Sequence, residues 1–317
     1  MQSALVIAYQ TVIMFILLAV GYFLYRSKLL GDEATQQLSN IAISIINPIV
    51  IFNAYQREFV PQMFRGLIFA LILGFIAQVV LVLSGLIIVR KTRRDFEVER
   101  FALGYSNCAF MGIPLVQATF GAEGVFYLTA FITAFNVFMW THGVILMSGK
   151  KLSGKELLKI ALSPAILAIV LGLVCFFTGL RLPGVIQQPL DYLGAMNTPL
   201  AMLVSGATIA KSGLLGAFKH PRVYFIQAFK LFIVPALLTA VLVTAEIFGV
   251  SSVIVRTILI AAAAPTASAT IMFAYKYEKN TETASHHFAL STVLGILSMP
   301  LIMFLAGALE GFMVPKL

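Results

Sequence analysis

Residues 105–115 read Tyr105-Ser106-Asn107-Cys108-Ala109-Phe110-Met111-Gly112-Ile113-Pro114-Leu115, which places a glycine, a proline and small polar residues inside an apolar segment long enough to cross a bilayer. A second stretch, Ala264-Pro265-Thr266-Ala267-Ser268-Ala269-Thr270, interrupts another apolar segment near the end of the chain. Because proline lacks an N–H and clashes with the preceding turn, each segment is expected to break there. Non-helical backbone at membrane depth survives only where protein buries it or where it lines a watery cavity. Two such breaks, one in each half, point to a transport site.

The composition indicates an integral membrane protein. Hydrophobic residues make up 60% of the 317 residues and charged residues only 11%, whereas a soluble domain carries about a quarter charged residues. Apolar segments of roughly 20 residues recur, which favours membrane helices over the shorter, alternating strands of a barrel. The net charge of +9 fits basic loops facing an anionic leaflet, so the bilayer, and no nucleic acid, is the expected partner. Residues 1–6 contain no Lys or Arg, so the first apolar segment is expected to stay in place as a helix rather than act as a signal peptide.

The sequence predicts an all-α integral membrane protein with ten transmembrane helices joined by short polar connections. The predicted spans are residues 3–25, 33–56, 61–89, 96–118, 121–148, 157–179, 187–210, 221–248, 252–276 and 282–310. Five spans per half, an odd number, make the second half (151–317) enter the membrane upside down relative to the first (1–150). Pro48 and Pro199 then lie at like depth in spans 2 and 7, as do Pro114 and Pro265 in spans 4 and 9. The halves therefore read as two inverted five-helix repeats, with broken helices 4 and 9 that cross. The alternative is a chance placement of prolines, which are common in membrane helices.

Charge in the connections predicts the orientation. The connections that follow odd-numbered spans hold sixteen basic residues: Arg26, Lys28, Arg90, Lys91, Arg93, Arg94, Arg100, Lys150, Lys151, Lys155, Lys159, Lys211, Lys219, Arg222, Lys276 and Lys279. The opposite side holds five: Arg57, Arg65, Arg181, Arg256 and Lys316. By the positive-inside rule the first set faces the cytoplasm, and both termini lie on the extracytoplasmic side.

The two breaks predict a site for an anion. Pro114 and Pro265 are expected near the first turn of the second half-helix, where a missing N–H costs nothing. The two half-helix N-termini would then meet near the midplane, each with unsatisfied N–H groups and the positive end of a helix dipole. Such a site suits a carboxylate. The side chains expected to complete it are Ser106, Asn107, Asn136, Thr266 and Ser268. In the alternative interpretation, Pro and Gly merely kink two packed helices, and Ser and Thr repair the backbone hydrogen bonds.

The sequence gives little sign of a coupling ion. The broken regions contain no Asp or Glu, and the acids Glu123, Asp191, Glu246, Glu282 and Glu310 stand at the ends of predicted spans. A carboxylate proton relay through the core is therefore not expected. Either an anion moves down its own gradient or backbone carbonyls hold a cation. Lys230, within span 8, has two interpretations: it snorkels about 15 Å to the interface, or it faces the interior and attracts the anion.

The remaining reactive residues point to no cofactor, no metal and no enzyme. His286 and His287 are adjacent, so they point about 100° apart on a helix, and no Asp, Glu or Cys follows at helical spacing. A packing role is expected for both, and for His142 a helix–helix contact. Cys108 and Cys175 form no metal-binding spacing, and buried inert thiols are expected. Phosphate-binding and hydrolase motifs are missing from the sequence.

The motifs in this chain resemble the auxin efflux carrier family, particularly its bacterial members. The resemblance rests on Asn107 with Gly112-Ile113-Pro114-Leu115, on Phe120-Gly121-Ala122-Glu123-Gly124 and Trp140-Thr141-His142-Gly143, and on Pro265-Thr266-Ala267 with Tyr275-Lys276-Tyr277. It covers essentially the whole chain. It departs from the bacterial pattern at Asn107-Cys108-Ala109, where Asn-Thr-Gly is frequent, and at Ser268-Ala269, where an Asn often follows the second proline.

The resemblance implies an elevator-type carrier of a small organic anion such as malonate, malate or an auxin-like acid. It implies a scaffold made of helices 1, 2, 6 and 7, which also forms a homodimer interface, and a transport part made of helices 3–5 and 8–10. It implies a multi-pass protein of the bacterial inner membrane, with Pro114 and Pro265 at the crossing and with Asn107 and Asn136 contacting substrate. Two alternatives stay open. One is a sodium- or proton-coupled symporter on the same scaffold, and the other is a membrane sensor that moves nothing, for which a sizeable cytoplasmic domain would be the expected signature.

Overall fold

The computed structural model describes residues 2–150, 154, 162–212 and 214–313. Within these residues the chain is helical, apart from one isolated antiparallel bridge between Ser106 and Thr266. The predicted all-α class is therefore confirmed for the described part of the chain. The basic residues Lys151, Lys155, Lys159 and Lys316, and the first residues of the predicted span 157–179, lie outside the described residues.

The α-helices follow the predicted segments closely. They are α1 (Gln2–Arg26), α2 (Asp32–Ile41), α3 (Asn47–Ala54), α4 (Pro61–Ile88), α5 (Phe96–Gly104), α6 (Ile113–Phe138), α7 (Val144–Ser148), α9 (Pro164–Thr178), α10 (Gly184–Ala195), α11 (Asn197–Ser212), α12 (Leu214–Ala217), α13 (Pro221–Ala228), α14 (Val234–Ile247), α15 (Ser252–Ala263), α16 (Ala269–Lys276) and α17 (Thr281–Met313). Between some of them the helix widens into single π turns: η1 (Ala42–Ile46), η2 (Cys108–Gly112), η3 (Met139–Gly143) and η4 (Phe229–Ile233). The two predicted spans that contain the breaks, 96–118 and 252–276, are each divided into shorter helices.

Helix length and hydropathy make this a multi-pass membrane protein. Seven described segments are long and apolar enough to cross a bilayer: Leu5–Arg26, Asp32–Ala54, Pro61–Ile88, Cys108–Ser148, Gly184–Ser212, Pro221–Ile247 and Thr281–Met313. The helices α9 and α15 are apolar but shorter. Cys108–Ser148 contains a reversal, because Gly121 has φ 62° and ψ −152°, a conformation that favours glycine. This residue separates the predicted spans 96–118 and 121–148.

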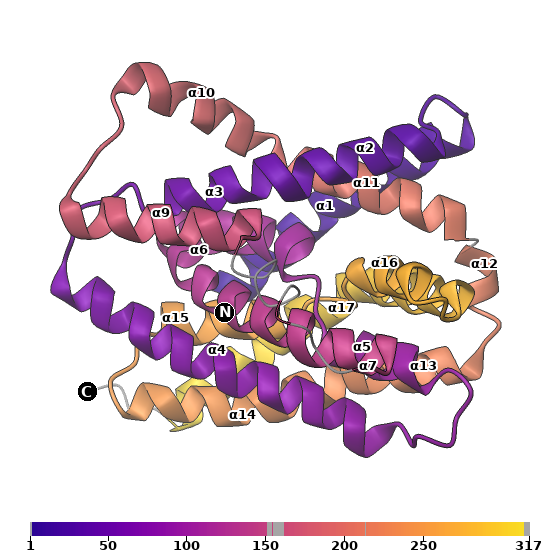
Figure 1. The fold of residues 1–317 in the computed structure, drawn as a ribbon. Coiled ribbons are helices and arrows are strands. Elements are labelled where there is room, and N and C mark those ends of the chain that lie inside the picture. The colour runs from indigo at the N-terminus through magenta and orange to yellow at the C-terminus, as the bar shows by residue number, and fades with distance from the viewer. Residues whose placement is uncertain (1, 151–153, 155–161, 213, 314–317) are drawn as a thin grey trace.

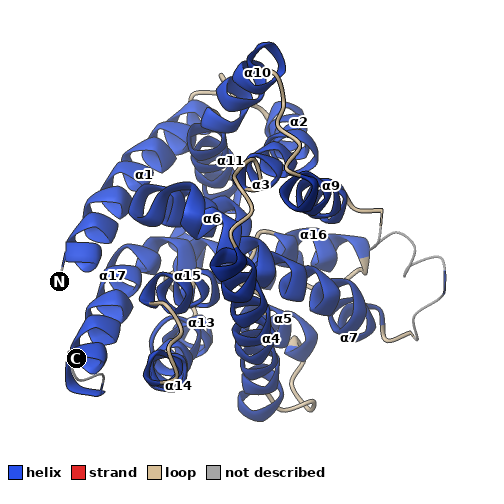
Figure 2. Cartoon of the chain, turned by 90° about the vertical axis from the view of Figure 1, so that its left-hand side faces the viewer, coloured by secondary structure: helices blue, strands red, loops and turns tan. Residues whose placement is uncertain are grey.

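The helices form two groups with α6 between them. Figures 1 and 2 show α1, α2, α3, α9, α10 and α11 on one side of the molecule, and α4, α5, α7, α13, α14, α15, α16 and α17 on the other. In Figure 1 the connections α1–α2, α4–α5, α11–α13 and α16–α17 lie at the right-hand end of the bundle. The connections α3–α4, α9–α10 and α14–α15 lie at the left-hand end. Successive connections therefore alternate between the two ends, as membrane spans require.

Three of the four π turns have a clear cause in the sequence. The turns η1, η2 and η4 end two residues before Pro48, Pro114 and Pro235 respectively. A proline inside an α-helix removes one N–H and drives its ring into the carbonyl four residues earlier. A locally widened turn relieves that clash without ending the helix. The structure therefore accommodates Pro48, Pro114 and Pro235 inside continuous helical segments.

Candidate functional site

The two broken segments meet in the interior and pair as short extended strands. The N–H of Asn107 donates to the carbonyl of Pro265 at 2.7 Å, and the N–H of Ala267 donates to the carbonyl of Tyr105 at 3.0 Å. Ser106 and Thr266 form the antiparallel bridge between these two bonds. Paired in this way, the backbone that has left the helix satisfies part of its own hydrogen-bonding need, which is required at membrane depth. The predicted approach of the two breaks is therefore observed, in the form of a backbone bridge.

At this crossing the last carbonyl groups of α5 each accept a hydrogen bond from a side chain. A helix leaves its last carbonyl groups without helical partners, and burial makes an unmatched carbonyl costly. Here three successive carbonyls accept from side chains of three different elements. The pairs are Ala102 with the Thr266 hydroxyl at 3.2 Å, Leu103 with the Lys230 ammonium at 3.2 Å, and Gly104 with the Gln78 amide at 2.9 Å. The break in span 4 is thus built into the fold and is not a passive kink.

Lys230 faces the interior. Its side chain is 0% exposed and lies in η4, where its Nζ donates to the carbonyl of Leu103. The snorkelling interpretation is therefore wrong. Among the described residues, no carboxylate lies within ion-pair distance of this ammonium group. An ammonium group has three N–H donors, so one bond to a carbonyl leaves two for other partners.

Thr266 is held by a polar network on the far side of the bridge. Its hydroxyl accepts from the Gln227 amide at 3.2 Å, and its N–H donates to the Ser291 hydroxyl at 3.0 Å. The same Gln227 amide nitrogen lies 3.0 Å from Nδ1 of His287. All four side chains are fully buried. The Thr266 side chain is therefore occupied in fixing the crossing, and its hydroxyl is already hydrogen-bonded.

Three buried polar atoms near the crossing have no protein partner. They are Nδ2 of Asn107, Oγ of Ser106 and Oγ1 of Thr270, which lies in the first turn of α16. Buried polar groups are nearly always hydrogen-bonded, so a group of unmatched ones calls for a specific explanation. Asn107 stands directly before η2, at the N-terminus of the second half-helix. These atoms are the side-chain groups at the crossing that a bound molecule can use.

The two prolines differ in where they lie relative to the helices that follow the breaks. Pro114 is the second residue of α6, in its first turn as predicted, and the widened turn η2 precedes it. Pro265 was expected at a similar place, but it lies in the extended link before α16, where its carbonyl accepts from Asn107. The reason is that residues 265–267 pair with residues 105–107, so α16 begins only after Pro265. Ser268 is the residue that precedes α16, and it is half-buried.

Asn136 does not lie free in the site. Its Nδ2 donates to the carbonyl of Ile132 one turn earlier in α6, at 2.8 Å. The contact between this part of α6 and the crossing runs instead through Tyr105, whose hydroxyl donates to the carbonyl of Phe138 and lies 2.9 Å from Nδ1 of His142. The predicted helix–helix role of His142 matches this contact.

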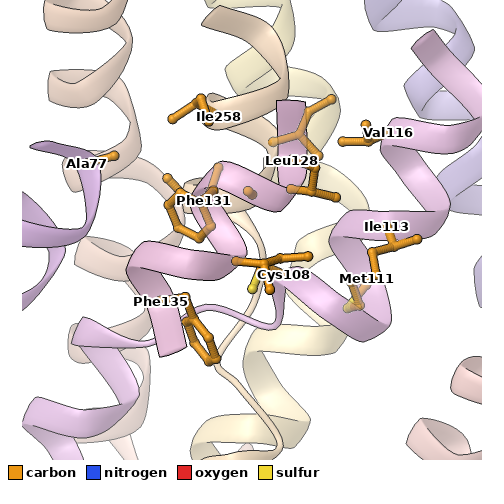
Figure 3. Close-up of a cluster of buried hydrophobic side chains, with 14 of the residues drawn as sticks. Ala77, Cys108, Met111, Ile113, Val116, Leu128, Phe131, Phe135 and Ile258 are labelled. Carbon is orange, nitrogen blue, oxygen red and sulfur yellow. The ribbon is translucent and has the colours of Figure 1, made fainter. Parts of the chain in front are cut away.

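Sequence reasoning missed Gln78, Gln227, Ser291 and Tyr105. Both glutamines stand alone in apolar spans, a signal that marks polar contacts between membrane helices. The cysteine at the crossing fits its predicted role, since Cys108 is 1% exposed and packs among the apolar side chains shown in Figure 3, including Met111, Phe131 and Phe135.

Comparison with known proteins decides the family. The model of the "Membrane transport protein" family (Mem_trans), the auxin efflux carrier family, matches residues 6–303. The chain belongs to this family. An "Uncharacterized transporter" of Methanothermobacter thermautotrophicus is 23% identical over 90% of this chain and 94% of its own length. A "Putative malonate transporter" of Rhizobium meliloti is 23% identical, with coverage of 94% and 96%. An "Uncharacterized transporter" of Methanocaldococcus jannaschii is 22% identical, with coverage of 91% and 95%.

The family and the named relatives are transporters, not enzymes. The resemblance stated from the motifs is thereby confirmed at the level of the family. The crossing in this chain combines a paired backbone, a buried cation and unmatched polar groups.

Proposed function

We propose that this transporter carries a small organic anion with at least one carboxylate, bound at the crossing of the two broken helices. The observation that carries the proposal is Lys230, an ammonium group fully buried beside the end of α5 with no carboxylate partner among the described residues. An unpaired buried charge costs several kcal/mol in a real protein, and an anion that enters the site offsets this cost. A lysine used only to cap a carbonyl would need no charge, because a neutral donor such as Gln78 does the same at Gly104.

Two further features support an anion. The N-terminus of η2 at Asn107 and the N-terminus of α16 after Ser268 both lie at the crossing, and each presents the positive end of a helix dipole. The unmatched Nδ2 of Asn107 is a donor that a carboxylate oxygen can accept from. The name of the Rhizobium meliloti relative, which mentions malonate, suits the same chemistry. We assign substrate contact to Asn107, Ser268 and Lys230, and a positioning role to Pro114, Pro265 and Thr266. Asn136 can join the contacts through its second amide N–H or its oxygen, because one N–H donates to Ile132.

The proposed mechanism is elevator-type alternating access by two inverted five-helix repeats. The first group of helices in Figures 1 and 2 contains the segments of predicted spans 1, 2, 6 and 7, and the second contains the crossing. In this proposal the first group is the scaffold and carries the homodimer interface. The second group moves with the anion, because the bonds around the crossing link α4, α5, η4 and α17 into one polar network.

We further propose that both termini lie on the extracytoplasmic side of the inner membrane of a bacterial cell. The alternating connections in Figure 1 support this, since those at the right-hand end carry the basic residues. Cysteine labelling of intact cells tests the orientation, with a low background because Cys108 and Cys175 are buried. An impermeant maleimide is expected to label Glu58→Cys and to spare Arg93→Cys until the cells are opened. Labelling of Arg93→Cys alone in intact cells would reverse the orientation.

Proteoliposomes loaded with buffer and offered radiolabelled mono- and dicarboxylates test the function. Uptake of one carboxylate is expected, and Lys230→Met should weaken its binding roughly ten- to a hundredfold, the value of a hydrogen bond to a charged group of about 1.5–3 kcal/mol. Asn107→Ala should weaken it as well. Matched controls are Lys91→Met and Asn40→Ala, both at exposed positions. Uptake that needs a sodium or proton gradient would show that the protein is a symporter and not an uncoupled carrier. Full carboxylate binding by Lys230→Met and Asn107→Ala together would refute the site, and binding without uptake in the wild type would favour a sensor.

A further inference from the structure

A group of metal-ligating side chains lies outside the two crossing segments. The imidazoles of His220 and His286 and the carboxylate of Glu282 each offer one ligand atom, and these atoms all lie within 4.8 Å of one another. His220 directly precedes α13, whereas Glu282 and His286 belong to the first two turns of α17. Two elements separated by more than sixty residues of sequence therefore converge on one point.

Helix geometry prepares two of the three ligands. Glu282 and His286 are four residues apart in α17, so their side chains share one face, and Nε2 of His286 lies 4.0 Å from Oε1 of Glu282. The ring of His220 stacks on that of His286, with ring centroids 5.0 Å apart and an angle of 28° between the planes. His286 is 5% exposed and so is held by its surroundings, whereas His220 and Glu282 are exposed and free to rotate toward it.

A glycine lets α12 approach the buried nitrogen of His286 closely. Gly216 of α12 faces His286, and a Cβ at this position would stand 2.9 Å from Nε2. Any larger residue would press on the nitrogen that points toward Glu282. A tetrahedral zinc site needs ligand atoms about 2.0–2.2 Å from the ion, hence roughly 3.3 Å from one another. Rotation of the two exposed side chains covers the difference.

The donor set selects the kind of metal. Two imidazoles and one carboxylate suit zinc and the late first-row divalent ions, and three protein ligands leave a fourth position for water. Lys219 and Arg222 add positive charge nearby, but the guanidinium group of Arg222 is neutralised by a two-pronged bond to Glu99. Glu282 then supplies the negative charge that favours a cation.

We propose that His220, Glu282 and His286 form a site for a divalent transition-metal ion, with zinc as the ion that fits best. A bound ion would tie the residue before α13 to the start of α17. It would thereby fix the end of the connection that leads from α11 through α12 into α13. This inference stands apart from the transported anion, since none of its three ligands contacts the crossing segments in the described structure.

Titration calorimetry of the full chain, with any affinity tag removed and with chelator dialysed away, tests the site with zinc alone as the probe. One zinc ion per chain is expected to bind, and zinc should raise Tm because it binds the folded form. Cobalt in its place should give the visible absorption of a tetrahedral site. No stoichiometric binding by the wild type would overturn the proposal.

Variants separate this site from adventitious binding. His220→Ala and His286→Gln should each weaken zinc binding by at least about tenfold, since even loss of a supporting residue costs 10- to 100-fold. His220→Cys should keep the affinity and add a sulfur-to-cobalt absorption band. Glu33→Gln, which removes another exposed acid from the first turn of a helix, is the matched control and should bind as the wild type does. Unchanged affinity in the His220→Ala/His286→Gln double variant would refute the assignment.

Discussion

The hydroxyl of Thr266 should be worth a measurable part of the stability of this protein, and Thr266→Val removes it with almost no change in shape. In the structure this hydroxyl donates to the carbonyl of Ala102 and accepts from the amide of Gln227. After the change, Gln227 keeps its contact with His287, but the carbonyl of Ala102 loses its side-chain donor in a fully buried place. The chain has left the helix by Tyr105, so the helical N–H that would reach this carbonyl is also absent.

The expected cost follows from that single carbonyl. Leaving a buried acceptor unmatched costs about 1–3 kcal/mol. With an unfolding entropy of roughly 2 cal/mol/K per residue, 317 residues give about 0.7 kcal/mol per kelvin, so Tm should fall by roughly 2–4 °C. The matched control is Thr239→Val, since Thr239 is also 0% exposed but its hydroxyl only doubles a helical bond to Pro235. Scanning fluorimetry of both detergent-purified variants at one scan rate gives the comparison. Equal Tm values for the two variants would refute the account of the crossing.

Two further predictions concern an ion pair and a close contact between two helices. Glu99→Gln should lower Tm more than Thr266→Val does, because it leaves Arg222 without its partner in a largely buried ion pair, which costs about 3–5 kcal/mol. The Glu99→Gln/Arg222→Gln double variant should lose less stability than the sum of the two single variants. Additive losses in that cycle would contradict the pairing. Gly206→Ala should sharply reduce the yield of folded protein, because a Cβ there would strike the backbone of α1 at Leu18, whereas Gly31→Ala meets open space and should be neutral in size-exclusion chromatography.

The broad architecture was predictable because it depends on hydropathy alone. Every predicted span coincides with helical residues where the chain is described, and the reversal at Gly121 falls where the sequence separates two spans. The two breaks were predictable for a related reason. Pro265 and the polar residues around Asn107 are local features, and membrane burial leaves few ways to accommodate them.

The direction in which a side chain points from its helix was not predictable. Lys230 lies in η4, and a π turn inserts extra backbone that rotates every later residue relative to a regular helix. The number of residues between Lys230 and the nearest loop therefore does not show whether its side chain points to the interface or to the interior. Asn136 lies in span 5 as expected, and one N–H of its amide bonds its own helix. A sequence does not show whether an amide will satisfy itself locally.

Partners far apart in sequence were equally hidden. No Asp, Glu or Cys follows His286 at helical spacing, whereas Glu282 precedes it by one helical turn and His220 reaches it from another segment. The divergence of His286 and His287 was correctly expected, because His287 turns to Gln227 while His286 turns to His220. The adjacent histidines thus serve two different places.

At the crossing α5 ends inside the protein, and one of the side chains that donates to its last carbonyl groups is the charged Lys230. Because α5 stops in the interior, its carbonyls need donors, and the fold supplies a hydroxyl, an amide and an ammonium group to three in succession. The hydroxyl and the amide each donate to one carbonyl and bring no charge. The ammonium group of Lys230 also keeps two N–H donors and a positive charge, and the carbonyl that it bonds, Leu103, is close in sequence to the unmatched amide of Asn107. If the only role of Lys230 were to donate to the carbonyl of Leu103, a glutamine at position 230 would do the same, as Gln78 does at Gly104. The Lys230→Gln variant therefore separates the two roles, since it should keep Tm near that of the wild type while carboxylate binding falls. A variant that loses stability and keeps its affinity would show that the ammonium group serves only the helix end.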